Sequence, residues 1–478
     1  MLSTSSSRAH GLPPGPTQPP VVQAIRLGRD PYAFLEDCGR RYGDLFTLRL
    51  PGDPPRIVTS DPALVRQIFS LGADDYQQAD QSFPINIGDG SLLFLDGERH
   101  RRERQLMMPH LHGERLRSYA TMMRDVAREV VKRWRPGDTF ALHPPLQEIT
   151  LNVILRCVFG IHDEAEAERL RRPLLTWLGD VMTPAVGLAG MVFNSARVRR
   201  FLDAAVVRAA GRGADGGRHY LPWQRLAESK ARVDALLRAE VERCRREGAG
   251  DRTDVLALLA GARYEDGAQM EVDHVVDELV TLLVGGHETT ATTLSWTLRH
   301  ALARPDVMAE LDAERARVFG GGPLDPTRAG ELLYLDACIK EAMRLTPIAV
   351  AVSRGLRRPI EMRGYQIPAG TILFPCVYLT HRRADLWPEP EKFRPERFMP
   401  TPNPPTNQFF PFGGGRRTCL GMAFAGFEMR IVLAEILASA KLRLAAGPSP
   451  DPIFRGVTVA PSESLRVVVD AVSPARAE

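Results

Sequence analysis

The chain has 478 residues, 44% of them hydrophobic and 25% charged, and its formal net charge at pH 7 is +4. These proportions are ordinary for a globular protein, and the charges are interspersed without the basic block expected of a nucleic-acid-binding protein. The six cysteines include no C-x-x-C pair, which argues against a zinc framework and favours a reducing compartment.

The hydropathy of the chain indicates neither a signal peptide nor a membrane span. Residues 1–8 lack an apolar core, and no uncharged run approaches the roughly 20 residues that a spanning helix requires. We therefore expect a cytoplasmic protein. The proline-rich stretch Leu12–Pro16 is interpreted as a stiff surface arm, and no linker separates independent cores after it. The expected organisation is an arm over residues 1–20 and a single domain over residues 21–478.

Two helices and a hairpin are predicted in the first 71 residues. Asp30 precedes Pro31 as a helix N-cap, and Gly43 ends the helical pattern after Tyr42. Turn residues between two apolar runs indicate the hairpin. The expected elements are a helix over 31–42, strands over 45–50 and 56–59, and a helix over 63–71.

Residues 73–95 carry few periodic signals and are predicted to form a long loop, a kind of segment that tends to be functional. A helix is expected to follow from about Glu98. His100 and Arg104 lie four residues apart on it and therefore share one face. On its own, this pair is as consistent with a solvated basic face as with a binding site.

The middle of the chain is predicted to be helical. Apolar periodicity favours helices over 115–134, 145–159 and 223–246, and the glycine-rich residues 211–217 mark a flexible link. A further pattern, from Val272 to about Leu302, is longer than an ordinary globular helix.

The centre of that long helix, residues 284–293, is a poor helix former because it contains two glycines and four threonines. We expect a locally opened helix that leaves a carbonyl unpaired and room for a small molecule. Two other interpretations stay open. His287 and Glu288 begin like the zinc-binding motif H-E-x-x-H, although Ala291 stands where the second histidine is needed. The stretch is also consistent with a purely structural kink.

One ion pair and several short strands are predicted in the last third of the chain. Glu341 and Arg344 lie three residues apart in a helical pattern, a spacing that is also common on protein surfaces. A strand is expected over 348–354, then a hairpin of strands 360–362 and 371–374, and terminal strands over 442–444 and 465–469.

A single cysteine follows a glycine run near the C-terminal end, in the sequence Phe412-Gly413-Gly414-Gly415-Arg416-Arg417-Thr418-Cys419-Leu420-Gly421. Glycines let the backbone approach a flat ligand closely. A helix N-terminus after the sulfur favours the thiolate, which is a metal ligand. Five of these residues fit the pattern Phe-x-x-Gly-x-Arg-x-Cys-x-Gly. The chain thereby resembles the cytochrome P450 haem-thiolate monooxygenases, in particular the soluble bacterial type.

The resemblance implies a mainly α fold with small β-sheets, an α+β protein in which helices surround a buried haem. The β-rich part is expected over about 44–60 and 348–377. Cys419 would bind the iron of haem b without covalent links to the porphyrin, tuned by the N–H groups of Leu420 and Gly421, and Phe412 would contact the cofactor. Four cations would neutralise the haem propionates: His100, Arg104, Arg354 and Arg417.

The resemblance also assigns roles to the long helix and to the ion pair. Gly285 and Gly286 would form a groove for dioxygen, Glu288 would relay protons, and Thr289 would hydrogen-bond the dioxygen. Glu341, Arg344 and Arg397 would form a buried structural network. The residues expected to line the substrate pocket are Val284, Ile348, Ala349, Val350, Val352 and Val457.

The implied activity is insertion of one oxygen atom from O2 into a lipophilic small molecule, by C–H hydroxylation or by epoxidation. Fatty acids, terpenoids, steroids and macrolides are substrates of this kind. Because the chain has no flavin or nicotinamide motif, electrons are expected from a ferredoxin or flavodoxin and its NAD(P)H reductase. Arg101, Arg102 and Arg416 are the expected docking surface for this partner, and we expect a monomer.

Two alternatives stay open at this point. One is a peroxide-driven peroxygenase or isomerase of the same fold, and the other is a non-catalytic protein that binds haem or lipid.

Overall fold

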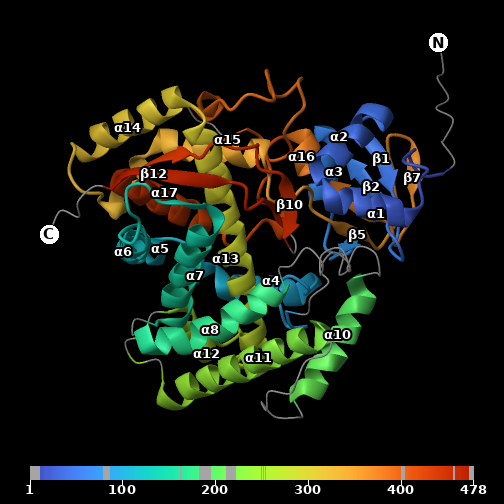
Figure 1. Ribbon diagram of the computed structural model, residues 1–478. Helices are drawn as coiled ribbons and strands as arrows, with labels where there is room; N and C mark the ends of the chain where they lie inside the picture. The colour runs from blue at the N-terminus through green and yellow to red at the C-terminus, as the bar shows by residue number, and fades with distance from the viewer. Residues whose placement is uncertain are drawn as a thin grey trace.

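The structure is a computed structural model, and the residues that it describes are 11–78, 87–161, 164–181, 195–210, 222–248, 250, 252, 254–399, 404–455 and 458–472. Helices make up most of this described chain, and its strands form four small sheets. Figure 1 shows a helical part around the long helix α13 (Val272–Leu302) and a smaller β-rich part beside it. The expected fold class, mainly α with small β-sheets, is confirmed.

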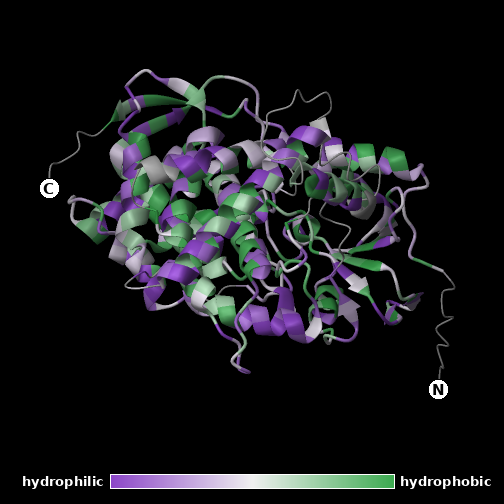
Figure 2. Cartoon of the chain, turned by 90° about the horizontal axis from the view of Figure 1, so that it is seen from below, coloured by the Kyte–Doolittle hydropathy of each residue, from purple (hydrophilic) through white to green (hydrophobic). Residues whose placement is uncertain are grey.

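The helical part is organised around α13, most of whose side chains are buried. This helix packs against α7, α11, α15 and α17. In Figure 2, hydrophobic residues of the helices gather toward the interior of this part. The other helices are α4 (Gly97–Met107), α5 (Glu114–Ser118), α6 (Ala120–Val131), α7 (His143–Phe159), α8 (Glu164–Val181), α10 (Ser195–Ala210), α11 (Pro222–Glu247), α12 (Val255–Gly261), α14 (Pro305–Phe319), α15 (Leu333–Leu345) and α17 (Met422–Ser439).

The β-rich part combines a five-stranded sheet with α1 (Pro20–Arg29), α2 (Pro31–Tyr42), α3 (Pro62–Phe69) and α16 (Val377–Thr380). The strand order is β1 (Leu45–Leu48), β2 (Arg56–Thr59), β8 (Ile372–Pro375), β5 (Arg354–Leu356) and β3 (Tyr76–Gln77). β1 and β2 pair antiparallel, with Leu45 opposite Thr59, and β2 pairs parallel with β8. The sheet therefore joins the first hairpin to a segment that follows α15.

The predictions for the first elements are confirmed. Asp30 caps α2 by accepting a hydrogen bond from the Ala33 N–H at 3.0 Å, and Gly43, with φ of 80°, ends the helix. The proline-rich arm lies along β1, where Thr47 donates from its N–H to the Pro14 carbonyl and from its hydroxyl to the Pro13 carbonyl. The division into an arm over 1–20 and one domain over 21–478 stays a prediction.

The strand predicted over 348–354 is wrong for most of its length. Residues 348–350 form bends, and β5 begins only at Arg354. The reason is that successive backbone groups bond to different elements: the Ile348 carbonyl accepts from Val459 N–H, and the Val350 carbonyl accepts from Tyr378 N–H. No single neighbouring strand runs along the segment, so the apolar pattern does not produce a ladder.

The prediction that strands 360–362 and 371–374 pair with each other in a hairpin is wrong. β6 (Ile360–Met362) pairs instead with β7 (Tyr365–Ile367), and β8 belongs to the five-stranded sheet. Arg363 and Gly364 both have positive φ, 48° and 82°, so a two-residue turn closes the hairpin immediately after β6.

The helix predicted over 115–134 is divided at Tyr119 into α5 and α6. The helices predicted over 145–159, 223–246 and 272–302 are observed as α7, α11 and α13. The loop 73–95 contains the short strand β3, and residues 79–86 lie outside the described chain.

The two terminal strands are observed as a pair. β9 (Ala440–Leu444) pairs antiparallel with β12 (Arg466–Val472), and β4 (Thr139–Ala141) adds to the other edge of β12. β10 (Pro452–Arg455) and β11 (Thr458–Pro461) form a separate hairpin. β4, β10 and β11 are not among the predicted strands. Of the helices in the part that the structure describes, none combines the length and hydropathy needed to cross a bilayer.

Candidate active site

The cysteine loop leads from a short 3-10 turn over residues 415–417 into α17. The Cys419 N–H donates to the Phe412 carbonyl at 2.9 Å, which closes the loop, and the Leu420 carbonyl lies 3.3 Å from His112 Nε2. His112 was not predicted, because no spacing in the sequence relates it to the cysteine. The loop thereby brings Phe412, Cys419 and Leu420 into one rigid segment.

The glycine run packs against the end of α3. A Cβ at Gly414 would lie 2.4 Å from the Phe69 ring, and a Cβ at Gly415 would lie 2.4 Å from the Phe69 carbonyl oxygen. Gly413 and Gly415 also have positive φ, 70° and 66°. Contact with Phe69 is therefore sufficient to exclude side chains at positions 414 and 415. The glycines there do not require the close approach of a flat ligand to explain them.

Cys419 differs from the other five cysteines in being exposed, whereas those five are buried. Desolvation raises the pKa of the Cys419 thiol, and the Gly421 N–H and the Arg104 charge lower it by less. The expected effect of the N–H groups at the start of the helix is therefore present, but desolvation outweighs it while no metal is bound. Deprotonation must accompany metal binding, as it does in other thiolate sites.

Three arginines and one histidine from three segments converge beside this loop. His100 and Arg104 come from α4, Arg354 from β5, and Arg417 from the turn before Cys419. Burial, followed by the charges of Arg417, Arg104 and Arg354, lowers the pKa of His100 to about 4. Burial likewise lowers the pKa of Arg354 to about 10. Like charges are held together here at a cost in stability.

These cations lack counter-ions within the described chain, with one exception. Arg417 pairs with Asp96 and donates to the carbonyls of Leu92 and Leu95. Arg354 donates to the carbonyls of Ser353 at 2.8 Å and Gly414 at 3.1 Å, and it is also hydrogen-bonded to the neutral Tyr76 side chain. No carboxylate among the described residues pairs with His100, Arg104 or Arg354. A site of this composition fits an anionic group.

A pocket of about 240 Å³ opens at this cationic cluster. Cys419 and Thr289 are not among its lining residues, so the pocket covers the basic cluster but not the cysteine or the open face of α13. Tyr76 was missed, although it lies in the loop predicted to be functional, and its ring is 5.4 Å from the Arg354 guanidinium carbon. The lining residues are Ala73, Tyr76, Asp96, Gly97, His100, Arg101, Arg104, Arg416 and Arg417.

The centre of α13 has one incompletely covered face. Gly285 is exposed and Thr289 is half-buried, whereas Val284, His287 and Glu288 beside them are buried. Positions 285 and 289 share a face at i, i+4 spacing. The helix continues without interruption through this stretch, so the expected local opening is wrong. The Gly285 carbonyl instead accepts a hydrogen bond from Thr289 Oγ1 at 2.5 Å.

The two glycines of α13 have different surroundings. A Cβ at Gly285 would meet nothing within 4 Å, and it would point toward the open face. A Cβ at Gly286 would lie 2.6 Å from Ile154 Cδ1 on α7. Gly285 therefore leaves space beside Thr289, whereas Gly286 permits two buried helices to approach closely.

Glu288 is buried, with 1% of its surface exposed, and its carboxylate is directed to α7. His143 Nε2 lies 3.1 Å from Oε1, and Gln147 Nε2 donates to Oε2 at 2.6 Å. Burial raises the pKa of Glu288, but the hydrogen bond and charge of His143, with the charge of Arg455, hold it below its ordinary value. Neither His143 nor Gln147 was predicted, because their contact with Glu288 is made across two helices.

The zinc interpretation of His287 and Glu288 has no support. Burial lowers the pKa of His287 to about 4. No group of three histidine, cysteine or acidic side chains in the described chain is placed to hold a metal ion.

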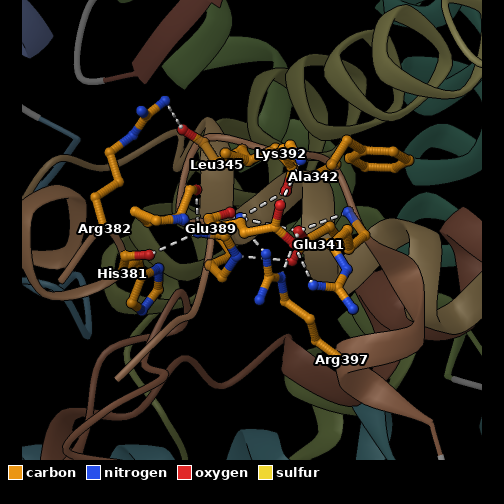
Figure 3. Close-up of polar contacts among 12 residues, drawn as sticks. Glu341, Ala342, Leu345, His381, Arg382, Glu389, Lys392 and Arg397 are labelled. Atoms are coloured by element: carbon orange, nitrogen blue, oxygen red, sulfur yellow. Dashed lines mark hydrogen bonds and ion pairs between the residues drawn. The ribbon is translucent and has the colours of Figure 1, made fainter. Parts of the chain in front are cut away.

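Glu341 and Arg344 form a buried pair in which both residues are 0% exposed. Arg344 donates from Nε and Nη2 to the two Glu341 oxygens, at 2.7 and 2.8 Å. Arg397 Nε and the Arg394 N–H add donors to Oε1, at 3.2 and 2.9 Å. Figure 3 shows Glu341 facing Arg397, with His381 and Lys392, whose carbonyls accept from Arg344, close by. The three residues expected in this network are therefore brought together.

The residues expected to line a substrate pocket lie in different environments. Val284 is buried on α13, whereas Ile348, Ala349 and Val352 are half-buried. Val350 packs into the core of the β-rich part with Tyr378 and Val459. Val457 lies outside the described residues.

The fold and the site together define a class of protein, a mainly helical haem protein with a cysteine ligand. An exposed cysteine beside a cluster of basic side chains, of which Arg104 and Arg354 have no carboxylate partner in the described chain, fits an iron porphyrin, which has a thiolate-binding metal and two carboxylates.

Comparison with known proteins agrees with this class. The model of the family described as Cytochrome P450 matches residues 13–212 and 215–468. A Mycobacterium tuberculosis protein named cytochrome P450 135B1 is 36% identical over 473 residues, which is 98% of this chain and 93% of that protein. Another, cytochrome P450 138, is 32% identical over 460 residues, 96% of each chain.

The fold comparison gives the same result. The solved structure of a retinoic acid-bound cyanobacterial CYP120A1 superposes with a TM-score of 0.80 at 22% identity, covering 96% of this chain and 99% of that one. The chain belongs to the cytochrome P450 family. It is a monooxygenase with haem bound through a cysteine thiolate, and its reaction requires O2, a substrate and an electron-transfer partner.

Proposed function

We propose that this monooxygenase inserts one oxygen atom into a lipophilic small molecule, by C–H hydroxylation or epoxidation. The overall reaction consumes the substrate, O2, two electrons and two protons, and it releases the oxygenated product and water. The observation that carries the proposal is the open face of α13, where Gly285 and Thr289 are accessible on a helix most of whose side chains are buried. A hydroxyl beside unfilled space is suited to a small polar molecule bound next to an apolar one.

Cys419 is the proposed iron ligand, and His100, Arg104, Arg354 and Arg417 are the proposed partners of the propionates. Phe412, Leu420 and Gly421 would hold the ligand loop against the porphyrin. The bound haem supplies the centre at which O2 is reduced and one oxygen atom is transferred. The chain supplies the anion-binding cluster and the closed loop that orient it.

Thr289 and Glu288 are the proposed proton-handling residues. Thr289 Oγ1 donates to the Gly285 carbonyl, so its oxygen can accept a hydrogen bond and pass a proton on the open face. Glu288 lies one residue earlier, turned toward α7, and holds its charge through His143 and Gln147. The protein thereby keeps a carboxylate near the groove without placing that charge in an apolar pocket.

The proposed substrate pocket is apolar. Val284, Ile348, Ala349, Val352 and Val457 are its proposed lining, with Val350 supporting it from the core. Branched aliphatic side chains favour a lipophilic ligand, such as a fatty acid, terpenoid, steroid or macrolide.

The electron donor is proposed to be a separate ferredoxin or flavodoxin, served by an NAD(P)H reductase. Arg416 is exposed and has no ion pair within the described chain, whereas Arg101 pairs with Glu98 and Arg102 with Asp266. Arg416 is therefore the most available cation of the three. Arg416→Glu should lower the association rate with an acidic donor about tenfold at low salt, and less at high salt. An association rate that is unchanged at every salt concentration would contradict the assignment of Arg416 to the docking surface.

The experiment that tests the function is a screen of lipophilic compounds against the purified haem protein. Binding is measured as a shift of the haem absorption band, and turnover is measured with an NAD(P)H-dependent donor system. Product that requires O2 and reductant supports the proposal. Full activity with hydrogen peroxide alone would indicate a peroxygenase, and spectral binding without product under either condition would indicate a binding protein.

A further inference from the structure

Glu288 belongs to a buried hydrogen-bonded set that joins α13 to α7. His143, with 2% of its surface exposed, contacts Glu288 Oε1 through Nε2 at 3.1 Å. Its other ring nitrogen, Nδ1, lies 2.9 Å from the Ser295 hydroxyl. His143 is therefore held at both ends by residues of α13 that lie about two turns apart.

The donors and acceptors of this set fix the position of one proton and require a second. The Ser295 hydroxyl donates to the Ala291 carbonyl at 2.7 Å, which uses its single proton. Ser295 must accordingly accept from His143, so Nδ1 carries a proton. The contact between Nε2 and Glu288 Oε1 then requires one further proton, because two acceptors cannot make a hydrogen bond.

That second proton has two available positions. Either it lies on His143, giving an imidazolium beside a carboxylate, or it lies on Glu288, giving a neutral imidazole beside a carboxylic acid. When it moves, the N–H bond at Nε2 breaks as the O–H bond at Oε1 forms, and the pair keeps the same net charge. No charge has to be created in the protein interior, so the transfer avoids the usual desolvation cost.

A neutral donor and one nearby cation favour the ionised form of Glu288. Gln147 Nε2 donates to the second Glu288 oxygen at 2.6 Å, and Arg455 Nε, from the end of β10, lies 3.8 Å from Oε1. His287 is the other titratable neighbour on α13, and its pKa of about 4 leaves it neutral at pH 7.

We propose that His143 is a positioning residue that stores one proton against Glu288 and so sets the supply of protons to the Thr289 groove. The inference rests on the proton-handling role proposed for Glu288. In each transfer the proton passes from His143 Nε2 to Glu288 Oε1 and then from Glu288 to a water molecule in the groove, and solvent water returns one proton to His143. Because Glu288 must be ionised to accept the proton from His143, coupled turnover should fall as the pH drops through the pKa of Glu288.

The test compares His143→Gln and His143→Phe with Glu288→Gln, in the haem-loaded protein. His143→Gln keeps a hydrogen-bond donor but cannot store a proton, so product formation should fall about tenfold, with a larger solvent deuterium isotope effect. The pH below which coupled product formation declines should be higher in His143→Gln than in wild type. The reason is that loss of the His143 charge raises the pKa of Glu288. The substrate-induced spectral shift should remain unchanged.

A readout independent of turnover comes from unfolding. The low pKa of Glu288 in the folded protein gives stability that is present above its ordinary value of 4.5 and is lost as the pH falls. The stability difference between wild type and His143→Phe should therefore be larger at pH 7 than at pH 4.

Three results would overturn the inference or its basis. Wild-type rate, isotope effect and pH profile in His143→Gln would show that the histidine stores no proton, even where Glu288→Gln is impaired. Fully additive losses in the His143→Gln, Glu288→Gln double variant would show that the two residues act independently. Wild-type behaviour of Glu288→Gln itself would instead remove the proposed role of Glu288.

Discussion

Two regions of this protein gather charged side chains, and they differ in whether the chain completes them. Around Glu341, both carboxylate oxygens and the Arg344 guanidinium have partners within the protein. Around His100, Arg104 and Arg354, basic side chains lie together without a carboxylate partner in the described chain. The first arrangement is satisfied within the protein, whereas the second is the proposed site of an anionic ligand. Both regions contain buried charged residues, so burial alone does not distinguish them. The difference is whether each charge has an opposite charge within the protein.

The largest effect is expected from Glu341→Ala. Arg344 would be left as an uncompensated buried cation, which costs roughly 3–5 kcal/mol of stability. We expect insoluble or haem-free protein, measured as the yield of folded protein and its haem content. The control is Glu331→Ala, which breaks an exposed pair with Arg328 and should cost at most about 1 kcal/mol. A soluble, fully haem-loaded Glu341→Ala variant would contradict the structural role.

Thr289→Ala acts on the open face and leaves both charged regions unchanged. Coupled product formation should fall on the order of 10²-fold, because the hydroxyl that passes the proton is lost. Haem content should stay at the wild-type level, and reductant should still be consumed with release of hydrogen peroxide. Thr289→Ser is the matched control and should retain most of the coupling. Full coupling in Thr289→Ala would refute the role of the hydroxyl.

Arg104→Leu tests the second region directly. Haem should dissociate roughly tenfold to a hundredfold faster, because a charge-assisted hydrogen bond contributes about 1.5–3 kcal/mol. The haem-free protein should be as stable as wild type or more stable, since a cation repelled by Arg417 is removed. The two measurements are haem transfer to a scavenger and unfolding of the haem-free form. If Arg104→Leu destabilised the haem-free protein as much as Glu341→Ala does, Arg104 would belong to a structural network rather than to a ligand site.

Glu278 offers a third case, a fully buried carboxyl whose oxygens accept no hydrogen bond from a described side chain. Burial raises the pKa of Glu278 well above its ordinary 4.5, so the folded protein binds this proton more tightly than the unfolded chain. Stability must then fall as the pH rises above 4.5, by up to about 1.4 kcal/mol per pH unit. Glu278→Gln should remove this decline, and the exposed Glu271→Gln should not. Unfolding by denaturant at pH 5, 6 and 7 measures the difference.

The sequence predicts well where a contact is local or carried by a motif. The cap at Asp30, the hairpin after Gly43 and the full length of α13 follow from neighbouring residues. The cations His100, Arg104, Arg354 and Arg417 could be grouped only through the family pattern, because they are far apart in the chain.

The predictions that were wrong or missing concern contacts that are not local. Each of them depends on a partner distant in the sequence. The segment 348–350 bonds to two unrelated elements, and His143 reaches Glu288 only because α7 packs on α13. The direction of the Cys419 pKa depends on how closely the whole loop surrounds the sulfur. Hydropathy and spacing report none of these quantities.

The absence of a side chain at position 286 has a consequence for the packing of α7 on α13. A methyl group there would lie 2.6 Å from the terminal methyl of Ile154, so the Ile154 side chain would have to turn away. Ile154 belongs to α7, the helix that also carries His143, the hydrogen-bond partner of Glu288. The bare backbone at Gly286 therefore lets α7 and α13 pack with Ile154 in its present rotamer, beside the contact between His143 and Glu288.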